Sequence, residues 1–167
     1  MEFIIDSYQN LNVSDEEIFE LLSQVYVKAG FTSAEMAQKL FDPVRVRDRG
    51  MLFASRETSK NEFSGMVIVV PPESKAIVIA KENECEMHLL GVAPKYRGYG
   101  LGRKLVIKAI EYAKDKNWSK IILWTQKPMK QAQRLYESLG FVRVGEMTKT
   151  GIEFLVYERK CVEIEHS

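Results

Sequence analysis

Features typical of membrane and secreted proteins are missing from this chain of 167 residues. No apolar run approaches the roughly 18–20 residues that a membrane-spanning helix needs, so we expect no membrane partner. The N-terminal segment MEFIIDSYQN lacks a basic region, a long apolar stretch and a small-residue cleavage site, so it does not resemble a secretory signal. Low-complexity stretches, repeats and linkers are also missing, which predicts one domain over residues 1–167.

Cysteine is scarce, with only Cys85 and Cys161 in the sequence. Two cysteines are too few for a disulfide framework or a zinc site, and they fit a reducing compartment. We therefore expect a cytoplasmic protein that binds no metal.

Charge is almost balanced at +1, and the 46% hydrophobic and 28% charged residues are ordinary for a globular protein. The distribution is uneven, because residues 95–134 contain eleven Lys or Arg but only Glu111 and Asp115 as acids. This segment has a net charge of +9, which leaves −8 for the rest. Such a basic segment predicts an anionic ligand, although helix surfaces that simply carry lysine would give the same count.

The spacing of apolar residues predicts strands and helices that form a mixed α/β (α+β) sheet covered on both faces. Ser14 and Glu17 form a capping-box signature, Thr32 or Ser33 is expected to cap a second helix, and Pro43 should follow its end. The expected helices are 15–30, 33–40, 101–116 and 130–139. The expected strands are 3–8, 51–55, 66–70, 86–92, 120–125, 141–144 and 153–157. Residues 56–64 read as a hairpin loop, and 73–83 as either a short strand or an excursion.

The most informative segment is LLGVAPKYRGYGLGRKL, residues 89–105. It predicts a strand, a tight glycine turn and the N-terminus of a helix. Free backbone N–H groups and the positive end of the helix dipole meet at such a turn and attract anions. Gly98, Gly100 and Gly102 lack Cβ atoms, so a phosphate group can approach the backbone closely. Positive side chains flank the turn: Arg97, Arg103 and Lys104.

Two common phosphate-binding motifs do not fit this turn. The Rossmann fingerprint G-x-G-x-x-G fails because its third glycine falls on Arg103 in one register and on Leu105 in the other. The Walker A motif fails because Arg103 stands five residues after Gly98, where a second glycine is required. The pattern that remains is Arg97-x-x-Gly100-x-Gly102.

The segment R-G-Y-G-L-G, after a strand that ends V-A-P-K-Y, resembles the pyrophosphate-binding motif of the GNAT-type N-acetyltransferases. The segment A-Q-R-L-Y-E-S-L-G-F, residues 132–141, resembles the second motif of that superfamily. One helix and one strand separate the two motifs, as in the family. The resemblance implies a GNAT-like fold with a central, mostly antiparallel sheet of six to seven strands, splayed at the cofactor site.

The resemblance also implies acetyl-CoA as the co-substrate and an amine as the acceptor. The splayed strands would be residues 86–92 and 121–125. The pantetheine arm would pair with backbone groups of Leu90, Gly91 and Val92. The diphosphate would rest on the turn formed by Arg97, Gly98, Tyr99, Gly100, Leu101, Gly102 and Arg103.

Tyr136 matches the family tyrosine that protonates the departing CoA thiolate. A phenol with a pKa near ~10 can transfer a proton to a thiolate whose thiol has a pKa near ~8.5. The structural alternative is a packed aromatic ring between Leu135 and Leu139.

Glu86 is the candidate general base, directly or through water. Strand alternation places Glu84, Glu86, His88 and Leu90 on one face, and buried polar side chains there need water, a partner or a function. The resemblance places an acidic residue near Glu86 in several family members. His88 is the second candidate, because its unperturbed pKa is near ~6.5. Both residues could instead be structural.

Two further positions bear on binding. Met129 stands where many relatives have an asparagine, so Gln126, Lys130 or Gln133 would have to replace its hydrogen bond. The arginines at 45, 47 and 49 lie where relatives build the acceptor pocket, and they form either an acidic-acceptor site or a solvated basic loop.

The sequence thus predicts transfer of an acetyl group from acetyl-CoA to a primary amine on a small molecule or a protein. The alternative from another class is a non-catalytic acyl-CoA-binding sensor. A nucleic-acid partner is not expected, because residues 95–134 lack interleaved aromatic side chains. The oligomeric state is undetermined, and a homodimer is left open.

Overall fold

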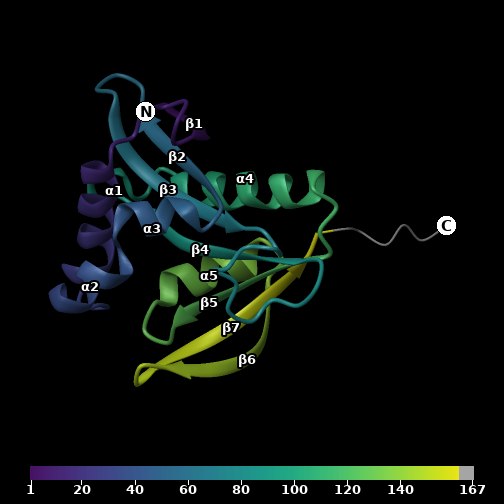
Figure 1. Ribbon diagram of the computed structural model, residues 1–167. Coiled ribbons are helices and arrows are strands. Elements are labelled where there is room, and N and C mark those ends of the chain that lie inside the picture. Colours follow the sequence, from purple (N-terminus) through teal and green to yellow (C-terminus); the bar gives the residue numbers. More distant parts are fainter. Residues whose placement is uncertain (162–167) are drawn as a thin grey trace.

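The computed structural model describes residues 1–161 and contains one sheet of seven strands in the order β1-β2-β3-β4-β5-β7-β6 (Figure 1). Only β4 and β5 are parallel neighbours within these residues. The strands are β1 Phe3–Ser7, β2 Met51–Glu57, β3 Glu62–Val70, β4 Glu84–Val92, β5 Lys120–Gln126, β6 Val142–Lys149 and β7 Ile152–Lys160. The helices are α1 Asp15–Leu22, α2 Ala34–Leu40, α3 Pro43–Asp48, α4 Leu101–Asp115 and α5 Lys130–Ser138. The sequence prediction of a mixed, mostly antiparallel sheet is confirmed.

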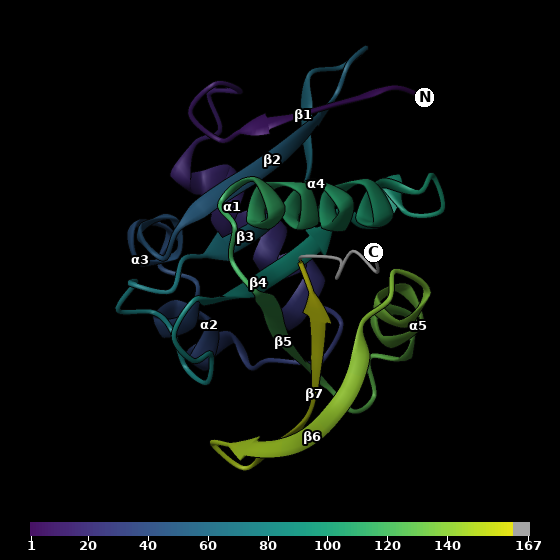
Figure 2. The same ribbon diagram turned by 90° about the vertical axis from the view of Figure 1, so that its right-hand side faces the viewer.

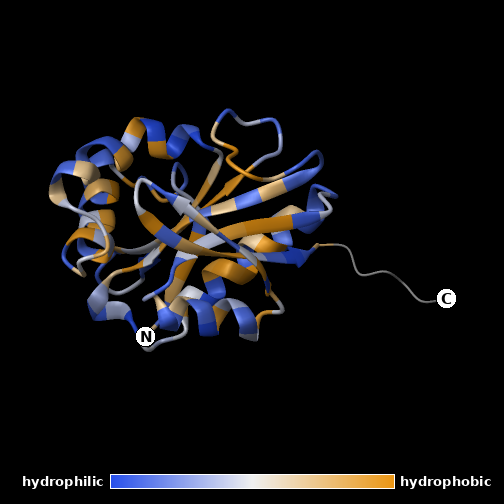
Figure 3. Ribbon diagram, turned by 90° about the horizontal axis from the view of Figure 1, so that it is seen from below, coloured by the Kyte–Doolittle hydropathy of each residue, from blue (hydrophilic) through white to orange (hydrophobic). Residues whose placement is uncertain are grey.

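Helices cover both faces of the sheet, and two apolar cores result. Val67 and Val69 of β3 pack toward α4 and α5, whereas Met66 and Ile68 pack toward α1 and α2. In Figure 2, α4 crosses in front of the sheet and the N-terminal helices lie behind it. Because β3 is buried on both faces, its sequence is a continuous apolar run, and Figure 3 shows the hydrophobic colour concentrated in the inner strands.

Side-chain caps fix the N-terminal helices where the sequence predicts them. The Ser14 Oγ accepts a hydrogen bond from the Glu17 amide at 3.1 Å, and the Glu17 carboxylate accepts one from the Ser14 amide at 3.0 Å. This capping box satisfies two amides that α1 leaves free. Ser33 caps α2 in the same way, through the amide of Met36. The first helix changes after Leu22 into a π-helical turn, Ser23–Val27.

The structure confirms that α2 ends before Pro43, but it adds a helix that the sequence did not predict. Pro43 begins this helix, α3, and Asp42 caps it, because proline suits the first turn of a helix. The hairpin between β2 and β3 is short, since both strands extend into the predicted loop of 56–64. Arg56 is buried there in an ion pair with Glu17 at 2.9 Å, which ties β2 to α1. Of the two alternatives for residues 73–83, the structure has the excursion, since no strand forms at 76–80.

β4 and β5 separate after a short paired stretch. Residues 84–86 pair with residues 120–122, and no pairing between these two strands continues beyond them within the described chain. β4 is also bulged, because it has one residue more than β3 between the pairs Met66–Gly91 and Ile68–His88. Leu89 lies in this bulge with a φ of 53°, in the left-handed region that non-glycine residues rarely adopt. The predicted splay of the sheet is confirmed, and the bulge alters the side-chain alternation along β4.

Within residues 1–161, no helix is long and apolar enough to cross a membrane.

Candidate active site

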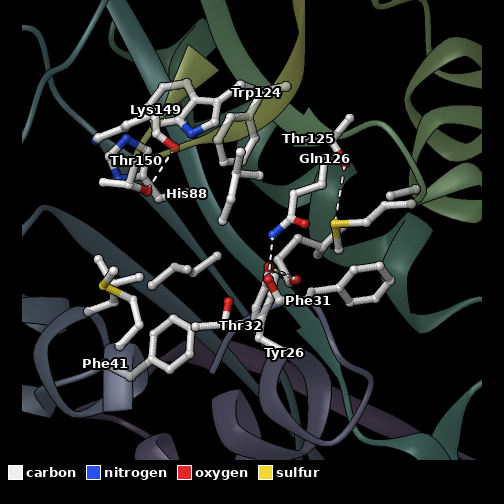
Figure 4. A pocket seen from close by; sticks show the side chains of 18 of the residues that line it. Tyr26, Phe31, Thr32, Phe41, His88, Trp124, Thr125, Gln126, Lys149 and Thr150 are labelled. Atoms are coloured by element: carbon white, nitrogen blue, oxygen red, sulfur yellow. Dashed lines mark hydrogen bonds between the residues drawn. The ribbon is translucent and has the colours of Figure 1, made fainter. Parts of the chain in front are cut away.

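A cavity of about 640 Å³ lies where β4 and β5 separate. Its size is within the roughly 300–1,000 Å³ typical of small-ligand sites. Figure 4 shows side chains that converge on it from the N-terminal helices, β4, β5 and the turn between β6 and β7. The labelled residues are Tyr26, Phe31, Thr32, Phe41, His88, Trp124, Thr125, Gln126, Lys149 and Thr150.

The lining of this cavity is mainly apolar and aromatic. Its only charged side chains among the described residues are Arg49 and Lys149, and no Asp or Glu of that part of the chain lines it. The cavity is therefore a positively charged site, which favours negative groups on whatever enters.

Tyr136 of α5 lines the cavity and is 6% exposed. Its ring packs against Phe141 and Tyr157, with ring centroids 5.8 and 6.3 Å away. The hydroxyl makes no hydrogen bond within residues 1–161 and is not among their fully buried polar atoms, so it faces the cavity. Burial, with a smaller effect of Tyr26, raises the pKa of Tyr136 above its ordinary value. The phenol therefore remains protonated and keeps a proton to donate.

His88 lines the same cavity, and its ring packs edge-on against the Trp124 ring, with the ring centroids 5.0 Å apart (Figure 4). Its Nδ1 is 3.2 Å from Nη1 of Arg49, and its Nε2 is 2.9 Å from Oε1 of Glu86. A guanidinium can only donate hydrogen bonds, so Nδ1 is the acceptor and Nε2 bears the proton. Burial and the charge of Arg49 lower the pKa of His88 and outweigh the opposite effect of Glu86, so the ring is neutral at neutral pH. Nδ1 is thus its basic atom.

Glu86 is fully buried and does not line the cavity. Besides His88, its carboxylate accepts the amide N–H groups of Val78, Ile79 and Ala80 at 2.7–3.0 Å. Burial alone would raise the pKa of Glu86, but these hydrogen bonds together lower it below the ordinary value. The carboxylate is ionised, and both of its oxygens are occupied by these hydrogen bonds. This geometry disfavours direct contact between Glu86 and an amine, and it indicates that Glu86 orients His88 and anchors the excursion.

The glycine turn lies outside the cavity, at the N-terminus of α4. Gly98 and Gly100 have φ values of 85° and 76°, which explains why glycine occupies both positions. A Cβ at either would meet no atom within 4 Å, so the turn is open on its outer side. The amides of residues 98–103 have no acceptor among the described residues, because the first bond of α4 runs from Lys104 to Gly100. A row of free amides at a helix N-terminus suits a phosphate ligand.

The glycine turn contacts α5, the helix that carries Tyr136. A Cβ on Gly102 would lie 3.5 Å from Leu135, the residue before Tyr136. The Arg103 guanidinium also donates to the Ser138 hydroxyl at 3.0 Å. The turn at the start of α4 therefore lies beside α5, which carries Tyr136.

Comparison with known proteins agrees with this geometry. Residues 16–141 match the family described as Acetyltransferase (GNAT) family. The chain belongs to this family. An acetyltransferase of the GNAT family from Staphylococcus aureus Mu50 has a TM-score of 0.77 at 18% identity and covers 96% of this chain and 100% of its own. The ribosomal-protein-S18-alanine N-acetyltransferase of Escherichia coli has a TM-score of 0.70 at 16% identity, with coverage of 98% and 97%.

Curated GNAT relatives match shorter stretches. The N-acetylaspartate synthetase of Danio rerio is 35% identical over 85 residues, which is 46% of this chain and 30% of that protein. The mycothiol acetyltransferase of Acidothermus cellulolyticus is 43% identical over 56 residues, 34% of this chain and 17% of that protein. This chain thus spans less than a third of these relatives, and their names refer to different acceptors.

In this GNAT chain, the strand residues predicted to bind pantetheine have different surroundings. Leu90 lines the cavity, and its carbonyl oxygen accepts the Tyr26 hydroxyl at 2.9 Å. Gly91 and Val92 lie outside the lining, and a Cβ on Gly91 would be 3.3 Å from Val25. The Leu90 carbonyl therefore already has a hydrogen-bond partner in the N-terminal helical segment.

The replacement of the motif asparagine by Met129 is partly explained. The Gln133 side chain donates to the carbonyls of Gln126 and Lys127 at 3.1 and 2.9 Å, which closes the turn before α5. The Gln126 side chain donates to the Phe31 carbonyl at 3.0 Å and so ties β5 to the N-terminal helices. Met129 itself lines the cavity.

Sequence reasoning did not single out Tyr26 or Lys149 as site residues, and it named Arg49 only as one of three arginines in a cluster that either binds an acidic acceptor or forms a solvated loop. The three arginines grouped by sequence separate here: Arg45 is exposed, Arg47 pairs with Asp15 at 3.0 Å, and only Arg49 reaches the cavity. Nothing in the local sequence distinguishes them, because Arg49 contacts a residue 39 positions away.

Proposed function

We propose that the protein transfers an acetyl group from acetyl-CoA to a primary amine by direct attack on the thioester. The observation that supports this most is Tyr136, a buried residue whose protonated hydroxyl faces the cavity. The family to which the chain belongs makes acetyl-CoA the expected donor.

The residues present fit this donor. The free amides at 98–103 and the open outer side of Gly98 and Gly100 suit its diphosphate. The unpaired edge of β4 beside Leu90 suits its amide-bearing arm. Acetyl-CoA supplies an activated thioester, so the protein needs only to place an amine, accept one proton and donate another.

His88 and Tyr136 take these two roles in the proposal. Nδ1 of His88 accepts a proton from the amine as nitrogen bonds to the carbonyl carbon. The C–S bond then breaks, and the Tyr136 hydroxyl gives its proton to the sulfur. Burial holds the phenol in its protonated form, so a proton is available at the sulfur when the C–S bond breaks.

Replacement of Tyr136 by Phe tests this assignment. Thiol release from acetyl-CoA with an amine acceptor should fall by about 10²–10⁴-fold, while the affinity for acetyl-CoA should change little because the ring remains. Tyr157→Phe is the matched control, since its ring contacts Tyr136 but its hydroxyl donates to Glu137 and does not line the cavity.

The outcomes separate enzyme from sensor. Unchanged turnover in Tyr136→Phe would remove the proton-donor role. Binding of acetyl-CoA without thiol release for any amine, in the unmodified protein, would favour the acyl-CoA sensor over the enzyme.

A further inference from the structure

Arg49 has an unusual environment for an arginine. It follows α3, lines the cavity and is half-buried. Its hydrogen-bond partners are both neutral: His88 Nδ1 at 3.2 Å and the Leu40 carbonyl at 3.2 Å. Two of its five N–H donors are used in this way, and no carboxylate of residues 1–161 pairs with it.

Glu86, the acid bonded to His88, does not neutralise this charge. Glu86 lies on the far side of the His88 ring, and its oxygens are occupied by His88 and three amides. Burial lowers the pKa of Arg49, which reflects the cost of holding a cation away from water. Lys149 adds a second positive charge to the lining. A half-buried cation without an anion is a costly arrangement unless a ligand supplies the anion.

We infer that the acceptor carries a carboxylate close to its amine, as a free α-amino acid does, and that Arg49 binds this carboxylate. The inference rests on the proposed acetyl transfer and names its acceptor class. A guanidinium has the planar geometry to hold a carboxylate through paired hydrogen bonds. Arg49 is therefore a specificity residue of the acceptor site.

The position of Arg49 beside His88 makes the acceptor geometry specific. One carbon separates the amine and the carboxylate of an α-amino acid, so the two groups can reach neighbouring partners. With the carboxylate on Arg49, the amine lies at Nδ1 of His88, the basic atom of that ring. A carboxylate that draws Arg49 toward itself also weakens the bond that occupies Nδ1, which leaves this nitrogen free to accept the proton.

The remaining lining defines the side chain of the acceptor. Phe31, Met36, Phe41, Trp124 and Phe154 line the cavity. Because no acid lines it among the described residues, a second ammonium group would have no partner. The acceptor is thus an α-amino acid with an apolar side chain rather than a polyamine or lysine.

Matched pairs of acceptors test this directly. Thiol release from acetyl-CoA is compared within two pairs: L-phenylalanine with 2-phenylethylamine, and L-leucine with 3-methylbutylamine. L-lysine, which carries a second ammonium group, is measured beside them. We expect the amino acid of each pair to have a kcat/KM at least about tenfold higher than its amine, since a charge-assisted hydrogen bond is lost with the carboxylate. Arg49→Gln should lower kcat/KM for the amino acids by about 10- to 100-fold and abolish the preference.

Arg45→Gln is the matched control, because it removes the same charge four residues earlier, at an exposed position of α3 outside the cavity. Arg49→Lys keeps the charge but loses the planar guanidinium, so its kcat/KM for the amino acids should lie between those of Arg45→Gln and Arg49→Gln. Thermal melts of each variant confirm that the fold is retained. A preference that persists in Arg49→Gln, or equal use of amines and amino acids by the unmodified protein, overturns the inference.

A binding measurement keeps the two proposals separable. 3-Phenylpropionate has the carboxylate and the ring but no amine, so it cannot react. Its affinity, measured calorimetrically in the presence of CoA, should be at least about tenfold weaker for Arg49→Gln than for the unmodified protein. Equal affinities, or no binding to either protein, overturn the acceptor class. Tight, Arg49-dependent binding without thiol release for any amine would instead refute acetyl transfer and leave the carboxylate site intact.

Discussion

Replacement of Glu86 by Gln should destabilise the protein although the two side chains have the same shape. The Glu86 carboxylate accepts three backbone amides and the His88 Nε2 proton, and the residue is fully buried. An amide side chain has one oxygen and one NH2 group, so at least one of these four donors must face another donor. A tautomer change in His88 does not relieve this, because Nδ1 would then oppose Arg49.

The magnitude follows from these hydrogen bonds. One lost hydrogen bond to a buried charged group costs about 1.5–3 kcal/mol of unfolding free energy. For a protein of this size, that corresponds to a fall in Tm of roughly 3–12 °C. Urea unfolding at pH 7.5, with Glu84→Gln as control, measures the difference. Glu84 lies two residues earlier on β4 and accepts only the Lys81 amide at an exposed site, so its replacement should cost under about 0.5 kcal/mol.

A second feature of the same experiment is its pH dependence. The pKa of Glu86 is lowered from 4.5, so its contribution to stability is complete above that pH and is lost as pH falls through the native value. The difference between the unmodified protein and Glu86→Gln should therefore shrink at acidic pH. An unfolding free energy equal to that of the unmodified protein at pH 7.5 would refute the hydrogen-bonding role assigned to this carboxylate.

Two other predictions concern the phosphate turn and the response to acid. Gly100→Asp should weaken CoA binding by on the order of tenfold or more, because it places a carboxylate beside the diphosphate. Gly100→Asn is the isosteric control: it shares about 1–2 kcal/mol of left-handed backbone strain but adds no charge, so it should bind CoA better than Gly100→Asp. Calorimetric titration with CoA compares the two variants, and equal affinities would contradict a phosphate site here. The unfolding free energy should decrease as pH falls below about 6.5, because His88 has a lowered pKa in the folded protein and is protonated first in the unfolded chain. At lower pH, Glu86 adds to the decrease, because its native pKa is lowered from 4.5 and its carboxylate is protonated more readily in the unfolded chain. Denaturant titrations from pH 8 to pH 4 should show this decline, and a flat profile would contradict it.

Local signals predicted most of the fold. The Ser14 capping box, the apolar run of β3 and the glycines after β4 depend on neighbouring residues, and each lies where the sequence places it. The errors have non-local causes. Because Arg56 is charged, the sequence predicts a loop at this position. In the structure Arg56 lies in a strand, and its ion pair with Glu17 of α1 offsets the cost of burying its charge.

The candidate site was predictable in part. The position of Tyr136 follows from the resemblance of residues 132–141 to a family motif, and the structure adds its exposure to the cavity. Strand alternation groups Glu86 with His88, but it does not predict that the excursion supplies three amides to one of them. The contact of Arg49 with His88 joins segments that are distant in the sequence, so no periodicity or motif can reveal it.

A chain of hydrogen bonds links these unpredicted features. The excursion amides hold Glu86, Glu86 fixes the proton of His88 on Nε2, and Nδ1 therefore faces Arg49 and the cavity. Removal of the Glu86 carboxylate would free the His88 ring to turn or to change tautomer. The substitution should therefore alter the basicity of Nδ1 as well as the stability of the protein. The fold thus places a saturated acid behind the histidine and an unneutralised cation in front of it. That order predicts that Glu86 acts on the site through His88, without contact with the cavity.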